Sequence, residues 1–276
     1  MPELPEVETV RRTLEELVIG KTIQTVEVAW PNIIKKPADT VEFADELKGQ
    51  TIQSMQRRGK FLLFELDHII MVSHLRMEGR YGVYKKEDEP VPHTHVIFSF
   101  TDGMELRYQD VRKFGTMHLF EKGTEEMTLP LSQLGVEPFS NDFTVELLQT
   151  AAQKTTRKIK PFLLDQKTVV GLGNIYVDEA LFRAGIHPER LAHTLTQHEY
   201  SKLHQTIVQT LDEAVKLGGS SIKSYVNGQG EIGMFQQTLE VYGRKNEPCK
   251  HCHDTIVRIV VGGRGTHYCP TCQKDR

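Results

Sequence analysis

The first residues of the chain carry groups that could attack a carbon atom. Pro2 follows Met1, and a small second residue usually lets the initiator methionine be removed, so the mature chain would begin with a secondary amine. Glu3 and Glu6 come next, and apolar residues then recur at helical spacing to Leu17. We therefore expect an amphipathic helix from Pro2 to about Leu17, whose positive end lowers the pKa of the amine. An unprotonated amine can form a Schiff base with an aldehyde-like carbon. An ordinary acidic helix start is the alternative.

The four cysteines form two CxxC pairs near the C-terminus, Cys249 with Cys252 and Cys269 with Cys272. This spacing indicates one tetrahedral zinc ion held by four thiolates. Two disulfides are the alternative, which a cytosolic compartment disfavours. The zinc is expected to be structural, because four thiolates leave no ligand position for a reactive water.

An arginine lies between the two cysteine pairs, where the pattern predicts a β-hairpin. Residues 255–261 and 266–268 are the expected strands, and Gly262 to Gly265 is the expected turn, with Arg264 at its tip. An arginine flanked by glycines can approach a phosphate closely and bind it with two hydrogen bonds. A plain solvent-exposed arginine is the alternative.

Two further positions in the first half of the chain could carry chemistry. Lys60 follows Arg58 and Gly59 at a predicted hairpin turn, where a solvated lysine is as common as a functional one. Phe114 stands between Lys113 and Gly115. A phenylalanine usually belongs to the core, but an exposed one with cationic neighbours is the type of residue that enters a DNA base stack.

Two segments of the second half could bind anions. Gly171 and Gly173 predict a tight turn, and Asn174 can start a helix that runs to Ala184. Backbone N–H groups at such a turn bind anions, but the third glycine of a dinucleotide fingerprint is absent. Residues 154–160 hold four cations without an acid, which indicates either a solvated helix face or a phosphate contact.

The elements that must position these residues change character along the chain. Short β-rich runs between residues 21 and 120 predict an antiparallel sandwich or barrel. Residues 121–142 are rich in glycine and proline and are expected to form a linker. Helical periodicity follows, in residues 143–152, with Asn141 or Asp142 as the cap, and in residues 196–217. A glycine-rich loop then precedes the zinc module.

Composition sets wider limits. The 276 residues are enough for two domains, and the 38% hydrophobic content is ordinary for a globular protein. The net charge of −3 does not indicate a nucleic-acid partner. Residues 151–276 are the more basic part of the chain and are the better candidate surface for a polyanion. No apolar run is long enough to span a membrane, and the N-terminus lacks the pattern of a signal peptide, so a cytoplasmic location is expected.

The motifs taken together resemble the bacterial formamidopyrimidine-DNA glycosylase (8-oxoguanine DNA glycosylase/AP lyase) family. The resemblance covers nearly the whole chain and rests on the N-terminal PELPEVE, Arg58 to Lys60, the turn at residues 171–176, and the terminal hairpin with Tyr242-Gly-Arg244 and Gly263-Arg264. Two positions depart from the family pattern: His253 and Asn246 stand where glycine is common.

The resemblance implies an α+β fold with three parts. These are a β-sandwich catalytic domain flanked by helices (residues 1–132), a helix–two-turn–helix DNA-binding domain with a lesion loop at residues 218–237 (133–238), and a zinc finger (239–276). It implies roles for individual residues as well. Pro2 would be the nucleophile, Glu3 the acid/base group with Glu6 in support, and Lys60 and Arg264 the groups that assist elimination. The expected DNA contacts are Met77, His93, Arg112, Phe114 and Asn174.

The activity implied is excision of oxidised purines from double-stranded DNA, followed by strand cleavage at the abasic site. The partner would be double-stranded DNA with oxidised purines or abasic sites, bound by a monomer. Two alternatives remain at this point. One is a glycosylase of the endonuclease VIII type, which acts on oxidised pyrimidines. The other is a zinc-ribbon DNA-binding protein without catalysis, which would have no use for Pro2 or Lys60.

Overall fold

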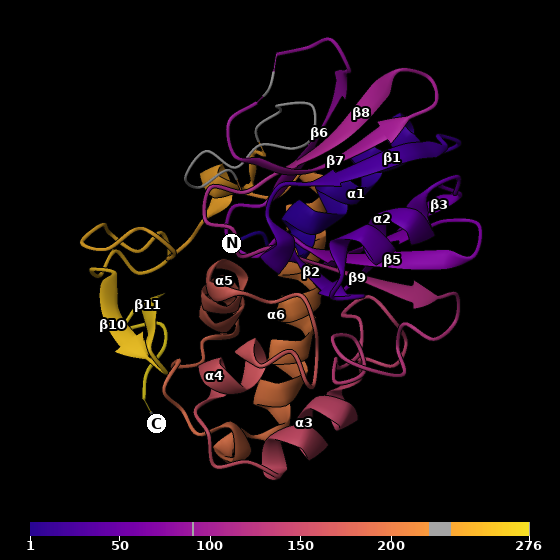
Figure 1. The fold of residues 1–276 in the computed structure, drawn as a ribbon. Coiled ribbons are helices and arrows are strands. Elements are labelled where there is room, and N and C mark those ends of the chain that lie inside the picture. Colours follow the sequence, from indigo (N-terminus) through magenta and orange to yellow (C-terminus); the bar gives the residue numbers. More distant parts are fainter. Residues whose placement is uncertain (90, 221–232, 276) are drawn as a thin grey trace. The chain divides into compact units, whose positions relative to one another are not determined.

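A computed structural model describes residues 1–89, 91–220 and 233–275 of the chain (Figure 1). The chain forms two compact units. The first unit contains residues 1–133 and the segment that begins at Ser220, and the second contains residues 134–219 and 234–276. Much of the predicted lesion loop, residues 221–232, lies outside the described residues.

Two β-sheets build the first unit, which confirms the predicted antiparallel sandwich. One sheet has the order β1-β7-β8-β6 and the other the order β2-β9-β5-β4-β3. Apolar residues from both sheets and from helix α1 share one core. The strands are β1 Ile23–Val28, β2 Ile34–Lys36, β3 Ser54–Arg58, β4 Phe61–Glu65, β5 Ile69–His74, β6 Arg80–Lys85, β7 Thr94–Phe100, β8 Met104–Gln109 and β9 Thr116–Glu121.

Helix α1 spans Leu4–Val18, so the expectation of a helix from Pro2 was wrong by two residues. Glu3 is the N-cap and has an extended backbone (φ −99°, ψ −174°), which places Pro2 outside the helix. The reason lies in the two glutamates, because the Glu6 carboxylate accepts the Glu3 backbone N–H at 2.8 Å. This contact is half of a capping box, which makes Glu3 the N-cap and Leu4 the first residue of the helix.

Several short elements of the first unit carry too weak a pattern to be predicted. Helix α2 (Thr40–Leu47) begins at Asp39, whose side chain accepts the Val41 N–H. A 3₁₀ turn (Pro31–Ile33) and strand β2 occupy the segment between β1 and α2. Strand β2 has only three residues and pairs in parallel with β9. Such pairing is set by a distant partner, not by local periodicity.

Helices dominate the second unit. They are α3 Val145–Gln153, α4 Ile159–Leu164, α5 Asn174–Ala184 and α6 Gln197–Lys216, with 3₁₀ turns at Ala192–Thr194 and Phe235–Thr238. The prediction of Asn141 or Asp142 as the cap of α3 was wrong, because the Thr144 hydroxyl accepts the Leu147 N–H. Strands β10 (Val257–Val261) and β11 (Arg264–Tyr268) form the expected terminal hairpin.

Within the described residues, none of the helices is long and apolar enough to cross a membrane.

Candidate functional site

The start of the chain is built into the first unit. Pro2 is buried, and Glu3 and Glu6 are only 2% and 4% exposed. One oxygen of Glu6 accepts the Glu3 N–H, and the other accepts the Ser220 N–H at 2.7 Å and its hydroxyl at 3.2 Å. A single carboxylate therefore joins the residue after Pro2 to the residue at which the glycine-rich loop begins. Chain termini are usually exposed and frayed, so a tied-down terminus is unusual.

Lys60 is also buried, at 6% exposed, which makes the alternative of a solvated turn lysine wrong. It lies between β3 and β4, directly after Gly59, whose φ of +57° allows the tight turn. The Arg57 guanidinium donates to the Gly59 carbonyl at 2.9 Å and fixes this turn from one side. A buried ammonium group held by a rigid turn is suited to bind an anion brought by a ligand.

His74 is a buried residue near Lys60 that no local sequence pattern singles out. Burial, together with the charges of Arg76 and Lys60, lowers its pKa from 6.5 to about 3. Its Nδ1 atom accepts the Arg76 backbone N–H at 2.8 Å, so the proton of the neutral ring is on Nε2. His74 thereby shapes the first residues of the loop that carries Met77.

Acid is expected to destabilise the protein through His74. The unfolded state takes up a proton below the ordinary pKa of 6.5, whereas the folded state does so only near pH 3. The contribution of His74 to the free energy of unfolding is therefore present in full above pH 6.5. It is lost as the pH falls, by about 2 kcal/mol at pH 5. Urea unfolding of the wild type and of His74→Asn, whose amide oxygen can replace Nδ1 as an acceptor, should show a smaller loss in the variant. Equal losses would contradict this assignment.

The predicted DNA-contacting residues of the first unit lie on loops. Met77 is half-buried in the loop after β5, and His93 is exposed before β7. Phe114 is 52% exposed, so the alternative that it belongs to the core is wrong. The Arg112 guanidinium lies 4.8 Å from the centre of the Phe114 ring. An exposed ring with an adjacent cation suits contact with nucleic-acid bases and phosphates.

In the second unit, the structure brings Asn174 beside the start of strand β11, where Arg264 lies. Asn174 is the first residue of α5, and its side-chain amide donates to the Gly265 carbonyl at 2.8 Å. Arg264 is exposed, but it is the first residue of β11 and not part of the turn, which consists of Gly262 and Gly263 with positive φ. The start of α5 therefore contacts the residue that follows Arg264, and a helix start and an arginine each favour an anion.

Within the basic run at residues 154–160, one of the four cations lies in the interior. Lys160 is fully buried, and its ammonium group donates to Asp178 at 2.7 Å, to the Thr266 hydroxyl at 2.8 Å and to the Gly265 carbonyl at 3.2 Å. Arg157 and Lys158 pair with Asp165 and Glu189 at 2.6 and 2.5 Å. Lys160 therefore supports the hairpin from inside, and the alternative of a phosphate contact is wrong for this residue. For Lys154, Arg157 and Lys158, which are exposed, it stays a prediction.

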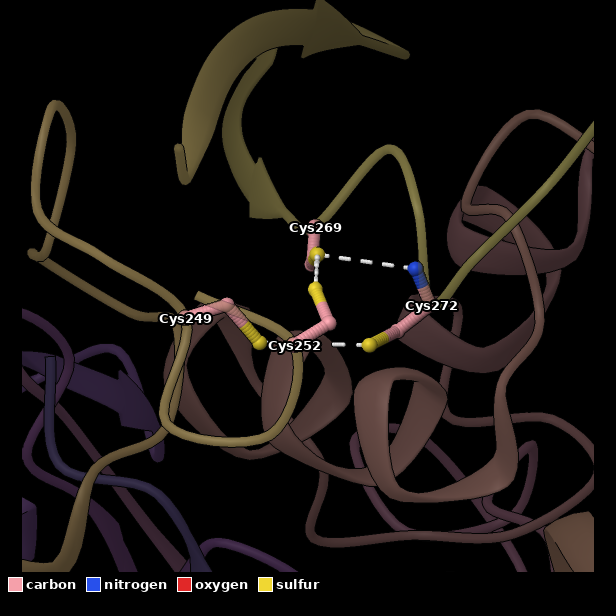
Figure 2. Close-up of side chains that lie close together, drawn as sticks. All are labelled: Cys249, Cys252, Cys269 and Cys272. Atoms are coloured by element: carbon pink, nitrogen blue, oxygen red, sulfur yellow. Dashed lines mark hydrogen bonds between the residues drawn. The ribbon is translucent and has the colours of Figure 1, made fainter. Parts of the chain in front are cut away.

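The four cysteines converge as predicted (Figure 2). Their sulfur atoms lie within 4.8 Å of one another, with 3.9 Å between Cys249 and Cys272 and 3.4 Å between Cys252 and Cys269. Zinc–sulfur bonds of about 2.3 Å in a tetrahedron require sulfur atoms about 3.8 Å apart. The donor set fits one structural zinc ion, and all four cysteines are free of disulfides.

The two departures from the family pattern have a conformational explanation. Asn246 and His253 have φ values of +69° and +64°, in the left-handed region that glycine adopts most easily. Asparagine and histidine are enriched there among the other residues. The substitutions therefore keep the backbone shape on both sides of the first cysteine pair.

Two further residues that position the second unit, Glu179 and Gln166, were not singled out from the sequence. The Glu179 carboxylate accepts the backbone N–H groups of Glu240, Val241 and Tyr242 at 2.9 to 3.0 Å, and burial raises its pKa. Gln166 accepts the Gly171 N–H and donates to the Leu172 carbonyl, each at 2.8 Å. The partners of Glu179 lie 61 to 63 residues away in the sequence, so no local pattern could have suggested its role. The partners of Gln166 lie only five and six residues away, and a polar residue before a glycine turn could have suggested its role.

A sandwich that buries Pro2 and a helical unit with a zinc-binding hairpin define a helix–two-turn–helix protein with a zinc finger. Residues 1–117 match the formamidopyrimidine-DNA glycosylase N-terminal domain, residues 134–226 match the H2TH domain of the same enzymes, and residues 246–274 match the zinc finger found in FPG and IleRS. The chain belongs to the formamidopyrimidine-DNA glycosylase family.

Similar proteins agree over the whole length. The formamidopyrimidine-DNA glycosylase of Cytobacillus firmus is 74% identical, covering 99% of this chain and all of the relative, and that of Bacillus subtilis is 63% identical over 100% of both. Two solved structures of the Lactococcus lactis protein are 43% identical and cover 99% of this chain and 100% of theirs. One is the wild-type protein in complex with DNA that contains N7-benzyl-Fapy-dG (TM-score 0.93), and the other is a complex with DNA that contains an abasic site (TM-score 0.92).

Proposed function

We propose that the protein is a DNA glycosylase that removes oxidised purines (8-oxoguanine and formamidopyrimidines) and then cleaves the strand as an AP lyase. Formamidopyrimidine-DNA glycosylases at 74% and 63% identity support the glycosylase activity and do not favour the oxidised-pyrimidine alternative. A DNA-binding protein without catalysis is not favoured either, because it would need neither a buried Pro2 nor a buried Lys60.

The observation that carries the proposal is the fixed position of the chain start. Glu6 holds the Glu3 N–H, and through Ser220 it is itself held by a distant part of the first unit. The amine that Pro2 acquires on removal of Met1 would therefore sit beside a buried carboxylate in a set orientation. Orientation of reacting groups can lower a reaction barrier by roughly 7–11 kcal/mol in favourable cases.

The proposed reaction begins with the Pro2 nitrogen, which attacks C1′ of the damaged nucleotide. The bond between C1′ and the base breaks, and the base leaves with a proton that Glu3 can relay. Positive charge builds on the sugar, and a carboxylate at Glu3 or Glu6 stabilises it. The sugar ring opens, and a Schiff base joins Pro2 to C1′.

Strand cleavage follows from the Schiff base, which draws electrons and makes the C2′ proton acidic. Loss of that proton expels the 3′ phosphate, and a second elimination expels the 5′ phosphate. We assign Lys60 and Arg264 to the phosphates, where a cation stabilises the leaving group, and Asn174 to a further phosphate contact. The zinc ion supplies structure alone, because the four cysteines fill its coordination sphere.

The DNA in the proposed complex is double-stranded. Met77, Arg112 and Phe114 fill the space of the extruded nucleotide, and Arg112 faces the orphaned cytosine. His93 is a further DNA contact. We further propose three domains with boundaries near residues 132 and 238, the second containing the lesion loop at residues 218–237. We also propose that the protein acts as a monomer in the cytoplasm and has no membrane partner. Light scattering with and without DNA would test the monomer.

Borohydride trapping tests the reaction. A duplex with one 8-oxoguanine opposite cytosine should become covalently linked to the wild-type protein, because borohydride reduces the Schiff base to a stable amine. Pro2→Gly and Glu3→Gln should each lose the adduct. The matched control is Glu16→Gln, which makes the same chemical change at an exposed position of α1 and should trap normally.

The outcomes separate the hypotheses. No adduct with tight lesion binding would refute catalysis and leave a damage-recognition protein. An adduct that forms with thymine glycol in preference to 8-oxoguanine would move the chain to the oxidised-pyrimidine alternative. An adduct that survives in Pro2→Gly would refute the assignment of the nucleophile.

A further inference from the structure

We infer that Tyr108 and Asp110 are positioning residues that lock together the two loops carrying Met77, Arg112 and Phe114. The inference rests on the proposed function, because it gives these loops the task of entering the DNA. Both residues lie at the end of β8 in the first unit, and neither bears a group that would itself need to touch DNA.

Asp110 organises the loop that carries Arg112 and Phe114. Its carboxylate is 1% exposed and accepts three backbone N–H groups, those of Arg112 at 3.0 Å and of Phe114 and Gly115 at 2.9 Å each. Its own backbone carbonyl contacts the buried Nε2 of His95 at 2.9 Å. One buried side chain thus accepts most of the backbone donors of the loop.

Tyr108 joins this loop to the one that carries Met77. Its hydroxyl donates to Asp110 at 3.3 Å. The same hydroxyl lies so close to two glycines that a Cβ atom would stand 2.2 Å from it at Gly79 and 1.7 Å from it at Gly115. Gly79 ends the Met77 loop and Gly115 ends the Phe114 loop, so both loop backbones close on one oxygen atom. Only residues without a side chain allow this approach.

The contacts make the loops rigid before DNA is bound. Lys113 between Arg112 and Phe114 has a φ of +58°, which a lysine adopts only when its neighbours hold it there. Extrusion of a nucleotide from a duplex costs a few kcal/mol. A wedge that must first become ordered would add its own entropy to that cost, whereas an ordered one would not. An ordered wedge is needed only when the nucleotide is stacked and paired in a duplex. A single strand has no paired stack to open, so it does not need the wedge.

The test compares two DNA substrates in the full-length, zinc-loaded protein. Asp110→Asn keeps the size of the side chain, but its amide nitrogen must face at least one of the three backbone N–H groups. Single-turnover excision of 8-oxoguanine from a duplex is expected to slow by roughly 10- to 100-fold. This is the rate factor that corresponds to the free-energy penalty of a buried donor without a hydrogen-bond partner. Borohydride trapping on a single-stranded abasic oligonucleotide should stay within about twofold of wild type. A fluorescent base analogue beside the lesion should show less unstacking.

Asp102→Asn is the matched control. Asp102 accepts the Met104 N–H at 3.0 Å and pairs with Lys21, so it fixes the turn at the opposite end of the same strand. The Asp102→Asn protein should excise from the duplex and trap on the single strand at wild-type rates. Tyr108→Phe keeps the ring and removes only the hydroxyl. It should slow excision from the duplex selectively, as Asp110→Asn does, but by a smaller factor.

Each outcome decides the inference. A selective loss on the duplex supports it. An Asp110→Asn protein that excises at the wild-type rate, or that loses trapping equally on the single strand with normal zinc content and thermal stability, overturns it. Failure of the wild type to trap on either substrate would instead refute the proposed function.

Discussion

A preparation of the protein that retains Met1 is expected to form no covalent adduct with damaged DNA. In such a chain the Pro2 nitrogen is an amide, which has no lone pair available for attack. The expected loss of single-turnover excision is at least ~10³-fold, the scale on which enzymes respond to removal of a nucleophile. DNA binding should change far less, because Met1 is 47% exposed in the present structure and Pro2 is buried with Met1 in place.

Mass spectrometry would establish the N-terminus of each preparation before the trapping reaction. Inhibition of methionine aminopeptidase during expression gives the retained form, and later treatment with the peptidase should restore activity in the same sample. An active preparation in which every molecule keeps Met1 would rule out the Pro2 amine as nucleophile. Fluorescence anisotropy with the same duplex controls for binding.

Zinc removal is expected to lower the affinity for lesion DNA by at least ~100-fold. The hairpin of β10 and β11 is too small to be stable alone. Its small core is built from Phe182, Val241 and Ile256 packed with the cysteines, so loss of the metal removes the support of Arg264. The first unit has its own core and should keep its β-sheet signal in circular dichroism.

The experiment follows zinc release, affinity and circular dichroism in one chelator titration. Added zinc should restore binding, which separates reversible loss of the hairpin from aggregation. Arg264→Gln serves as a comparison, because it removes one side chain and leaves the zinc site intact. Unchanged affinity after complete zinc release would mean that the hairpin does not contribute to binding.

Local patterns were enough to predict much of the molecule. The short β-rich runs, the helix expected from residue 196 and the CxxC pairs all appear in the structure. Each is defined by residues close together in the sequence. The family pattern extended this to Pro2 and Lys60, whose burial a local pattern cannot predict.

The sequence could not predict contacts that depend on distant partners. Lys160 reads as one more surface cation, yet its partners Asp178 and Thr266 bury it completely. Asp110 reads as a turn residue, and only the fold shows that its carboxylate collects three backbone donors. A buried charge needs partners, and single-sequence reasoning cannot find partners that lie far away along the chain.

The Glu6 carboxylate has a consequence for the order in which the protein is made. Its bond to the Glu3 N–H joins neighbours and can form as soon as α1 emerges from the ribosome. Its bond to the Ser220 N–H cannot form until most of the chain has been synthesised, since all residues of the second unit up to Gly219 come first. Domains generally fold as units during synthesis, N-terminal first. Here the earliest residues of the chain reach their final arrangement only near the end of translation, so a nascent chain released before Ser220 has an incomplete N-terminal site.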